Sequence, residues 1–122
     1  MLPVRGVLPL YADEDRLEKS LVSAMRAAGF DELTALEAKR LAATDEEQLL
    51  NAARLRRVLF SGNVRDFSRI HGDWMRTGRQ HWRIVLANDQ FWSVGEQVRR
   101  LVVLKESVAD TRNQLLYLSN CG

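Results

Sequence analysis

Short, uninterrupted apolar runs alternate along this chain with stretches of helical periodicity, and this alternation most limits the folds open to it. The runs end in polar or turn-forming residues and comprise residues 7–12, 58–60 and 84–87, with a weaker candidate at 32–35. Strands that are apolar on both faces are typical of a parallel sheet covered by helices on both sides. Because Pro9 has no amide proton for sheet pairing, we place it near the start of its strand.

Apolar residues spaced three and four positions apart predict helices between these strands. The first helix carries Leu17, Leu21 and Met25 and should stop at Gly29. Later stretches repeat the spacing on Leu49, Leu50 and Ala53, on Phe67, Ile70 and Trp74, on Val98, Leu101 and Val102, and, after a cap at Asp110, on Leu115, Leu116 and Leu118. We therefore expect one α/β domain over residues 1–122, a small three-layer α/β/α sandwich with a four-stranded, mainly parallel sheet and five helices.

Two sequence patterns mark helix starts. Thr44 and Glu47 form a capping box, in which the hydroxyl accepts from the amide three residues on and the carboxylate reaches back. Ser93 and Glu96 repeat the pattern ahead of the fourth helix. Asp45 follows the first cap, where a carboxylate is favoured by the positive end of the helix dipole.

Composition places the chain among ordinary globular proteins. With 122 residues, 46% of them hydrophobic, it has the size of one domain, and no run approaches the roughly 18–20 apolar residues of a membrane-spanning helix. The first residues do not resemble a signal peptide, so we expect a cytoplasmic protein with no membrane partner. The single cysteine, Cys121, predicts a frayed terminal thiol, and with only two histidines zinc and copper sites are disfavoured.

Charge is unevenly distributed along the chain although the net charge is only +2. Arginine outnumbers lysine 15 to 3, and residues 54–83 carry eight arginines against two aspartates. The planar guanidinium suits paired hydrogen bonds to phosphate, which makes a polyanionic partner plausible. A solvated helix face explains the same composition equally well.

Acidic and amide side chains follow the predicted strands where ligands bind in parallel sheets. Asp13 and Asp15 come directly after the first strand, Asp45 opens a helix on the same edge, and Asn63 and Asp66 follow the third strand. Converging carboxylates repel one another unless protons or a cation offset their charge, and hard oxygen ligands favour Mg²⁺ or Mn²⁺. Such a site can activate water against a phosphoryl group. Taken singly, most of these acids are better explained by helix capping or by a place in the first turn of a helix.

Five segments together resemble a known family. Residues 10–15, 44–49 and 58–67, followed by 93–101 and the ending 118–120, look in this order and spacing like the PIN-like fold. More narrowly, they resemble its short bacterial branch related to the VapC-type toxin ribonucleases. The likeness covers roughly residues 7 to 120. It implies a metal-dependent ribonuclease, often a toxin that is held inactive by a cognate antitoxin.

The resemblance also assigns roles by position. Asp13 matches the first-strand acid at the metals, Asp45 the helix-opening acid and Asn63 the place of the last acid, with Asp66 nearby as a substitute. Ser61 stands where the family usually has threonine. Because Asn63 is neutral, the acidic set is one charge short, and Glu37 is the only nearby candidate for the family's helical glutamate.

The first functional hypothesis is a ribonuclease dependent on Mg²⁺ or Mn²⁺, the toxin half of a toxin–antitoxin pair. Its metal ligands would be Asp13, Asp45 and Asp66, with Asn63 completing the catalytic set. RNA phosphates would be bound by Arg56, Arg65 and Arg69.

The second hypothesis is a catalytically weakened or inactive PIN-like module that acts by binding nucleic acid, an antitoxin-like partner or a second copy of itself. Trp82 and Trp92 would suit such an interface if exposed, although tryptophan more often packs inside. A third hypothesis, a receiver-like phosphorylation domain, lacks an aspartate at the end of the third strand and has Lys105 inside a helix. His71 and His81 are expected to be partly exposed and are assigned no role.

Overall fold

The computed structural model describes residues 8–13, 18–39, 43–106 and 112–121, which form an α/β fold around a parallel sheet. The strands are β1 (Leu10–Ala12), β2 (Glu32–Thr34), β3 (Val58–Ser61), β4 (Ile84–Leu86) and β5 (Leu115–Tyr117). The helices are α1 (Lys19–Ala27), α2 (Asp45–Arg54), α3 (Val64–Arg76) and α4 (Val94–Glu106), followed after β5 by the 3₁₀ helix η2 (Leu118–Asn120). The strand order is β2-β1-β3-β4-β5, and every pair is parallel.

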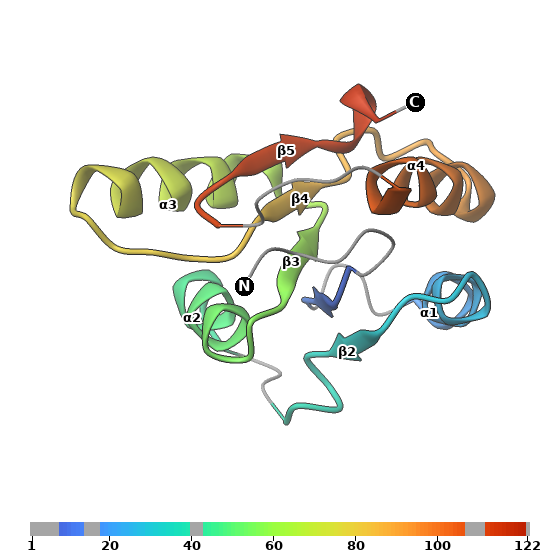
Figure 1. Ribbon diagram of the computed structural model, residues 1–122, viewed down its shortest axis with the longest axis horizontal. Coiled ribbons are helices and arrows are strands. Elements are labelled where there is room, and N and C mark those ends of the chain that lie inside the picture. Colours follow the sequence, from blue (N-terminus) through green and yellow to red (C-terminus); the bar gives the residue numbers. More distant parts are fainter. Residues whose placement is uncertain (1–7, 14–17, 40–42, 107–111, 122) are drawn as a thin grey trace.

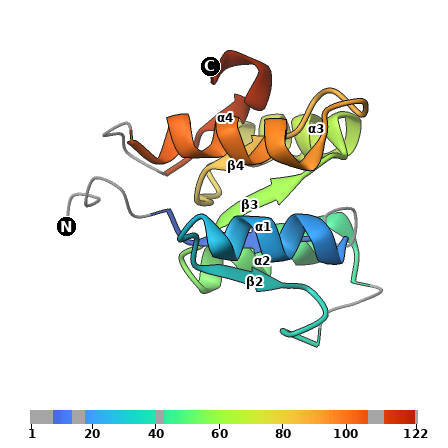
Figure 2. The same cartoon turned by 90° about the vertical axis from the view of Figure 1, so that its right-hand side faces the viewer.

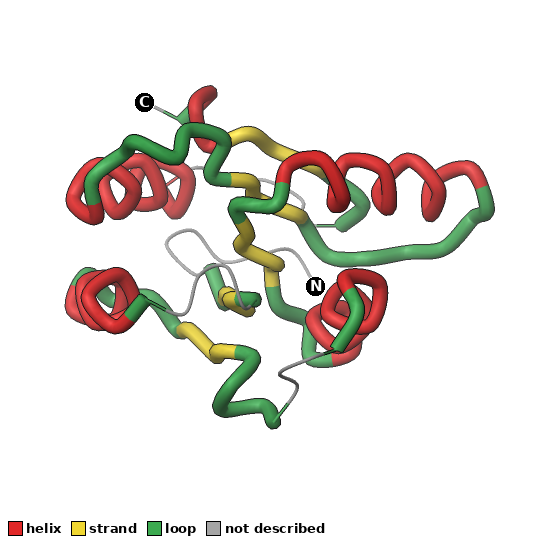
Figure 3. The backbone as a smooth tube through the Cα atoms, turned by 180° about the vertical axis from the view of Figure 1, so that it is seen from behind, coloured by secondary structure: helices red, strands yellow, loops and turns green. Residues whose placement is uncertain are grey.

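The helices cover both faces of the sheet. Figure 1 places α2 and α3 on one side of the strands and α1 and α4 on the other. The quarter turn in Figure 2 brings α1 and α4 to the front with α2 and α3 behind, and Figure 3 gives the same layers from the back. The three-layer α/β/α arrangement expected from the sequence is therefore confirmed.

Alternating side chains divide the core into two halves. From β3, Val58 and Phe60 pack towards α1 and α4, whereas Leu59 packs towards α2 and α3. In β4 the middle residue, Val85, joins the first half, and Ile84 and Leu86 join the second. Because β1, β3 and β4 are buried on both faces, they are apolar over nearly their whole length, and this explains the continuous apolar runs in the sequence.

The end of the chain differs from the prediction. The expected last helix on Leu115, Leu116 and Leu118 is replaced by β5, which pairs with β4 through Ile84 and Leu115, and by η2. The sheet therefore has five strands rather than four, and the described residues contain four α-helices rather than five. So short an apolar run is compatible with the periodicity of a helix or of a strand. It forms a strand because the unpaired backbone of β4 offers hydrogen-bond partners along its open side. Asp110, the expected cap, lies outside the described residues.

Several local signals are confirmed. Thr44 Oγ1 accepts from the Glu47 amide at 3.2 Å, so the expected cap forms, and the Glu47 carboxylate reaches back to accept from the Thr44 hydroxyl at 3.0 Å. Ser93 accepts from the Glu96 amide at 3.1 Å, but the Glu96 carboxylate turns to Arg99 and Arg100 instead. The expected helix stop at Gly29 has φ +90°, a conformation that glycine adopts without strain.

Cys121 is buried, which corrects the expectation of a frayed thiol. It packs with Leu118 in the core half beneath α1 and α4, because η2 folds the end of the chain back onto the sheet. This burial raises the pKa of the thiol. In the described part of the chain, no helix combines the length and apolar character needed to cross a membrane.

Candidate functional site

The site lies where the chain connections diverge from the centre of the sheet. β1 and β3 are neighbours in the sheet, and the connection leaving β1 runs to β2 on one side, whereas the connection leaving β3 runs to β4 on the other. In parallel sheets ligands bind beside such a switch point, at the carboxyl ends of the strands. Asp13 follows β1 directly, and Ser61 is the last residue of β3.

Ser61 joins the first strand to the third. Its hydroxyl donates to Asp13 Oδ2 at 2.8 Å and accepts from the Asn63 backbone amide at 3.0 Å. Both Asp13 and Ser61 are buried. The Ser61 hydroxyl thus holds the buried carboxylate in a fixed position relative to the following turn.

Asn63 gathers the two remaining acids. Its side-chain nitrogen donates to Asp45 Oδ2 at 3.2 Å and to Asp66 Oδ2 at 3.0 Å. Its side-chain oxygen accepts from the Asp66 amide at 3.3 Å and so caps α3. Asp45 and Asp66 lie in the first turns of α2 and α3, so the amino ends of two helices meet at this asparagine. The four expected site residues, Asp13, Asp45, Asn63 and Asp66, are therefore connected by hydrogen bonds through Ser61.

The surroundings of Asp66 favour its charged form. The hydrogen bond from Asn63 contributes most to lowering the pKa of this carboxyl, and a hydrogen bond with the Asp45 side chain lowers it further. The positive charges of Arg69 and Arg65 add to this effect. Asp66 is thus an ionised, partly exposed carboxylate at neutral pH.

The three predicted phosphate-binding arginines lie in two separate parts of the fold. Arg65 and Arg69 are exposed on the first two turns of α3 beside Asp66, and Arg69 also lies 3.8 Å from Asp73. Arg56 lies in the turn between α2 and β3, at the end of the sheet where the strands begin and opposite to the site. A turn that leads from a helix into a parallel strand always lies at the edge where the strands begin, and this separates Arg56 from the site.

Other arginines of the basic segment have structural contacts. Arg57 donates to the Asp31 carboxylate and to the Leu10 carbonyl, and Arg83 donates to the Gln114 side chain. Arg79 lies 3.9 Å from the centre of the Trp74 ring. Much of the arginine excess therefore serves packing and backbone hydrogen bonding, and only part of it remains available to a polyanion.

Comparisons with known proteins assign no family. No protein-family model matches the chain. Neither a curated protein nor a solved structure matches it. The function must therefore be argued from the geometry of the site.

The oxygen atoms of the site suit a hard cation only in part. Across the residues that the structure describes, no three His, Cys, Asp or Glu side chains form a group that could hold a metal ion. The third place beside Asp45 and Asp66 belongs to the amide of Asn63. Mg²⁺ bound by one or two carboxylates takes its other ligands from water and substrate phosphates, and Asp45 and Asp66 are the carboxylates that this arrangement would offer. Asp15 lies outside the described residues.

Glu37 is engaged elsewhere. Its carboxylate lies 2.6 Å from Arg26 and accepts from the Thr34 amide at 3.0 Å. The Thr34 hydrogen bond, followed by the one from Arg26, lowers the pKa of Glu37. The candidate for the helical glutamate is thus paired with α1. Lys105, which the receiver-like hypothesis would need beside the site, instead lies in α4 with Nζ 3.3 Å from the Ala28 carbonyl.

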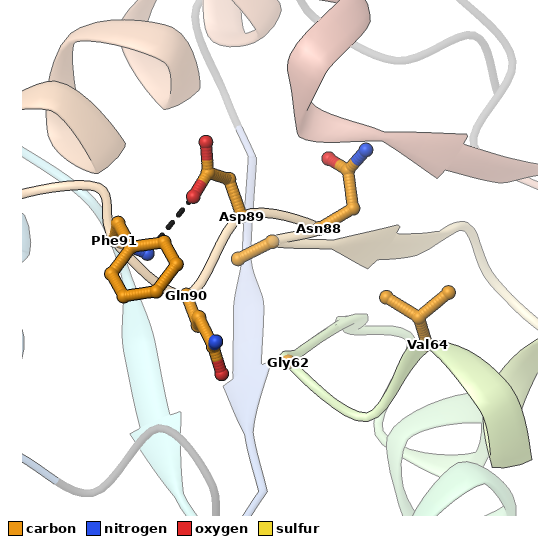
Figure 4. Close-up of a pocket in the computed structure, with 7 residues that line it drawn as sticks. Gly62, Val64, Asn88, Asp89, Gln90 and Phe91 are labelled. Carbon is orange, nitrogen blue, oxygen red and sulfur yellow. Dashed lines mark hydrogen bonds between the residues drawn. The ribbon is translucent and has the colours of Figure 1, made fainter.

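Two features were not found by sequence reasoning. His71 Nδ1 lies 2.8 Å from His81 Nε2, and His81 is buried rather than partly exposed. The second feature is a cavity of about 410 Å³, rimmed by the exposed ring of Phe91 (Figure 4). It adjoins the end of the sheet where Asp13, Asp45 and Asp66 gather, which we call the carboxylate edge. Each depends on segments that meet only in the fold. Trp82 and Trp92 are both half-buried, which lies between the two alternatives considered for them.

Proposed function

We propose that this protein is a PIN-like ribonuclease that hydrolyses RNA with Mg²⁺ or Mn²⁺ held at the carboxylate edge. The observation that carries the proposal is the convergence of Asp45 and Asp66 on one atom of Asn63, with Asp13 linked to the same turn by Ser61. These residues come from three separate segments. Three acids are not needed for capping two helices, since Thr44 and Asn63 already cap α2 and α3.

Each residue has a distinct task in this proposal. Asp45 and Asp66 would hold the cation, which would supply charge stabilisation and an activated water at the phosphodiester. Arg65 and Arg69 would bind the flanking phosphates, since both are exposed on the same side of α3. The buried Asp13, held in place by the Ser61 hydroxyl, would add negative charge near Asp45 and Asp66 and so favour binding of the cation.

The biological role is proposed from the same resemblance. A PIN-like ribonuclease of this size is expected to act as the toxin of a toxin–antitoxin pair, with a cognate antitoxin protein as its partner and self-association into a homodimer. Growth arrest on expression, relieved by co-expression of a cognate antitoxin protein, is the expected result.

The direct test combines metal binding and cleavage in purified protein free of host nucleases. Mn²⁺ titration by calorimetry should give binding that is lost in Asp45→Asn and in Asp66→Asn. Cleavage of single-stranded RNA should be lost in these variants and in Asp13→Asn. Glu46→Gln is the matched control. Glu46 is exposed in the same first turn of α2, and its replacement removes one negative charge outside the hydrogen-bonded group of Asp13, Asp45, Asn63 and Asp66. Unchanged cleavage in Asp13→Asn would remove the proposal.

One observation favours a second candidate, a module that binds without cleaving. The amide of Asn63 already offsets the repulsion of Asp45 and Asp66 by donating to both. A site satisfied in this way needs no ion for stability. Absence of Mn²⁺ binding in the wild-type protein, together with retained binding of RNA or of a partner, would decide for this candidate.

A further inference from the structure

A cavity adjoins the carboxylate edge on the side of β4. It has a volume of about 410 Å³ and is lined by Gly62, Val64, Ala87 and the turn 88–91. Gly62 and Val64 are the chain neighbours of Asn63, so cavity and carboxylates share one turn. In Figure 4, Gln90 and Phe91 lie on one side of this space and Val64 on the other, with Gly62 between them.

The turn presents Phe91 in a fixed way. The Phe91 amide donates to Asp89 Oδ1 at 2.9 Å, and the Trp92 amide donates to the Asp89 carbonyl at 3.3 Å. Behind it, the Trp92 ring is half-buried beneath the Arg100 guanidinium, 4.5 Å from the ring centre. The backbone on both sides of Phe91 is thus tied down, while its own ring is 87% exposed. Because this backbone is already ordered, a partner that binds at Phe91 need not order the turn.

The polar groups around the cavity can recognise the edge of a base. Asn88 is held in place by Ser119, to which it donates at 2.8 Å and from which it accepts at 3.1 Å. Gln90 is exposed, with an amide able to donate and accept. The Asp89 carboxylate adds an acceptor suited to exocyclic amino groups or ring N–H groups.

We propose that this cavity binds one unpaired base of the RNA substrate, stacked on Phe91 and contacted at its edge by Gln90 and Asp89. The inference rests on the proposed function, because the base would belong to the strand whose phosphate lies at the carboxylates. Aromatic side chains that stack on bases are a general means of holding single-stranded RNA. A duplex keeps its bases stacked inside, so the substrate class is single-stranded RNA.

A nucleotide explains the cavity better than an apolar protein segment does. The groups beside Phe91 are the amides of Asn88 and Gln90 and the Asp89 carboxylate, whereas a docking groove for an apolar segment needs more apolar surface. The carboxylate edge adjoins the cavity through Asn63, and Arg65 follows Val64 along α3. A strand that places a base on Phe91 would then reach both the acids and the arginines.

Binding without cleavage is the cleanest test. Fluorescence anisotropy with labelled U₈, A₈, C₈ and G₈ in EDTA measures affinity in the absence of any metal step. Phe91→Ala should weaken binding of the preferred oligonucleotide about tenfold or more, and Phe91→Tyr should restore it to within about twofold. In Phe91→Trp, binding of the oligonucleotide should quench the indole fluorescence. A hairpin of the same composition with a fully paired stem should compete poorly.

Leu36→Ala is the matched control, because Leu36 is also a strongly exposed apolar side chain, 60% exposed, but lies near α1 and β2. Equal affinity of Phe91→Ala and wild type, or equal loss in both alanine variants, would overturn the subsite. So would the absence of any oligonucleotide binding by the wild type. Sedimentation of a dimer that Phe91→Ala converts to monomer, without an effect on RNA binding, would assign the ring to self-association instead.

The subsite and the proposed function can fail separately. If the wild type cleaves RNA and Phe91→Ala has the same KM and base preference, the subsite is wrong and the ribonuclease stands. If no metal binds and nothing is cleaved, yet oligonucleotide binding depends on Phe91, the ribonuclease is wrong and the base-binding cavity stands.

Discussion

The side-chain nitrogen of Asn63 donates to Asp45 at 3.2 Å, and this one hydrogen bond joins the amino ends of α2 and α3. The same nitrogen lies 3.0 Å from Asp66, so a neutral donor occupies the space between two carboxylates. Both acids also face helix amino ends, where the backbone dipoles favour negative charge. The Asn63 amide thus offsets part of the negative charge that gathers at this site.

Replacing Asn63 with aspartate should convert this balance into dependence on metal. In EDTA, Asn63→Asp should lower the free energy of unfolding by about 1–3 kcal/mol, because two donated hydrogen bonds are replaced by like-charge repulsion. When the Mn²⁺ concentration is about one hundred times the Kd of the variant, Mn²⁺ should raise the free energy of unfolding of Asn63→Asp by about 2–3 kcal/mol. The same Mn²⁺ concentration should raise that of the wild type by less. Thermal melts with and without Mn²⁺ measure both. Asn63→Ser retains the helix cap without the charge and should show no such gain.

Ser61 should stabilise the site through its buried hydroxyl. Ser61→Ala removes the donor to Asp13 and the acceptor for the Asn63 amide, and should lower the free energy of unfolding by about 1–3 kcal/mol. Urea unfolding measures this change. Ser20→Ala, which removes only an exposed hydrogen bond to Glu18, should change it by less than about 0.5 kcal/mol. Equal effects of the two variants would contradict a role for Ser61 in holding the carboxylate.

The arginines of α3 should affect RNA affinity, and Arg56 should not. Arg65→Ala and Arg69→Ala are each expected to weaken binding of single-stranded RNA, and the dependence of affinity on salt should become less steep by about one phosphate contact for each. Arg56→Ala is the matched control, since it has the same exposure and charge but lies at the opposite edge of the sheet. A loss in Arg56→Ala as large as in the other two would show that the binding is not localised at the site.

The two histidines should make the protein less stable as the pH falls. Burial is the main cause that lowers the pKa of both His71 and His81 in the folded protein. Between these lowered pKa values and the ordinary value near 6.5, the unfolded chain binds more protons, so the free energy of unfolding falls as the pH drops from about 7 towards 5. The slope is bounded by about 1.4 kcal/mol per pH unit for each histidine.

Urea unfolding at pH 5, 6, 7 and 8 measures this slope. The chain has only two histidines, so the double variant His71→Gln/His81→Gln contains none and should lose the histidine slope entirely. A slope equal to that of the wild type would assign the pH dependence to other groups. Because Glu32 titrates in part of the same range, the comparison is best made in Glu32→Gln protein.

Glu32 should act on stability in the opposite direction. Its carboxylate oxygens are buried and have no hydrogen-bond partner among the residues that the structure describes, and burial raises the pKa of Glu32 from 4.5 to about 7. The folded protein therefore holds a proton that the unfolded chain releases, so stability is lost as the pH rises from 4.5 to about 7. Glu32→Gln should increase the free energy of unfolding at pH 8 by about 2 kcal/mol and change it little at pH 4. Glu46→Gln, at an exposed position, is the control and should be nearly neutral at both pH values.

Local patterns were sufficient for much of the fold. The apolar runs 7–12, 58–60 and 84–87 contribute β1, β3 and β4 as expected, because burial on both faces favours apolar side chains at successive positions. The Thr44 hydroxyl caps α2 by accepting from the Glu47 amide, and this contact within residues 44–47 places Asp45 at the start of the helix. The meeting of Asp13, Asp45, Asn63 and Asp66 at one edge also followed from the sequence, since alternating parallel strands and helices bring these chain positions together. The catalytic role of these residues stays a prediction.

What the sequence by itself determined is therefore the kind of fold and the edge at which its acids gather, because both depend on periodicity and on connections between neighbouring elements. The tertiary structure decided the rest. Only the vacant edge of β4 makes residues 115–117 a strand, and only the return of η2 buries Cys121. The pairing of His71 with His81 and the direction of the Asn63 amide depend on side chains that approach through space, where no local spacing constrains them.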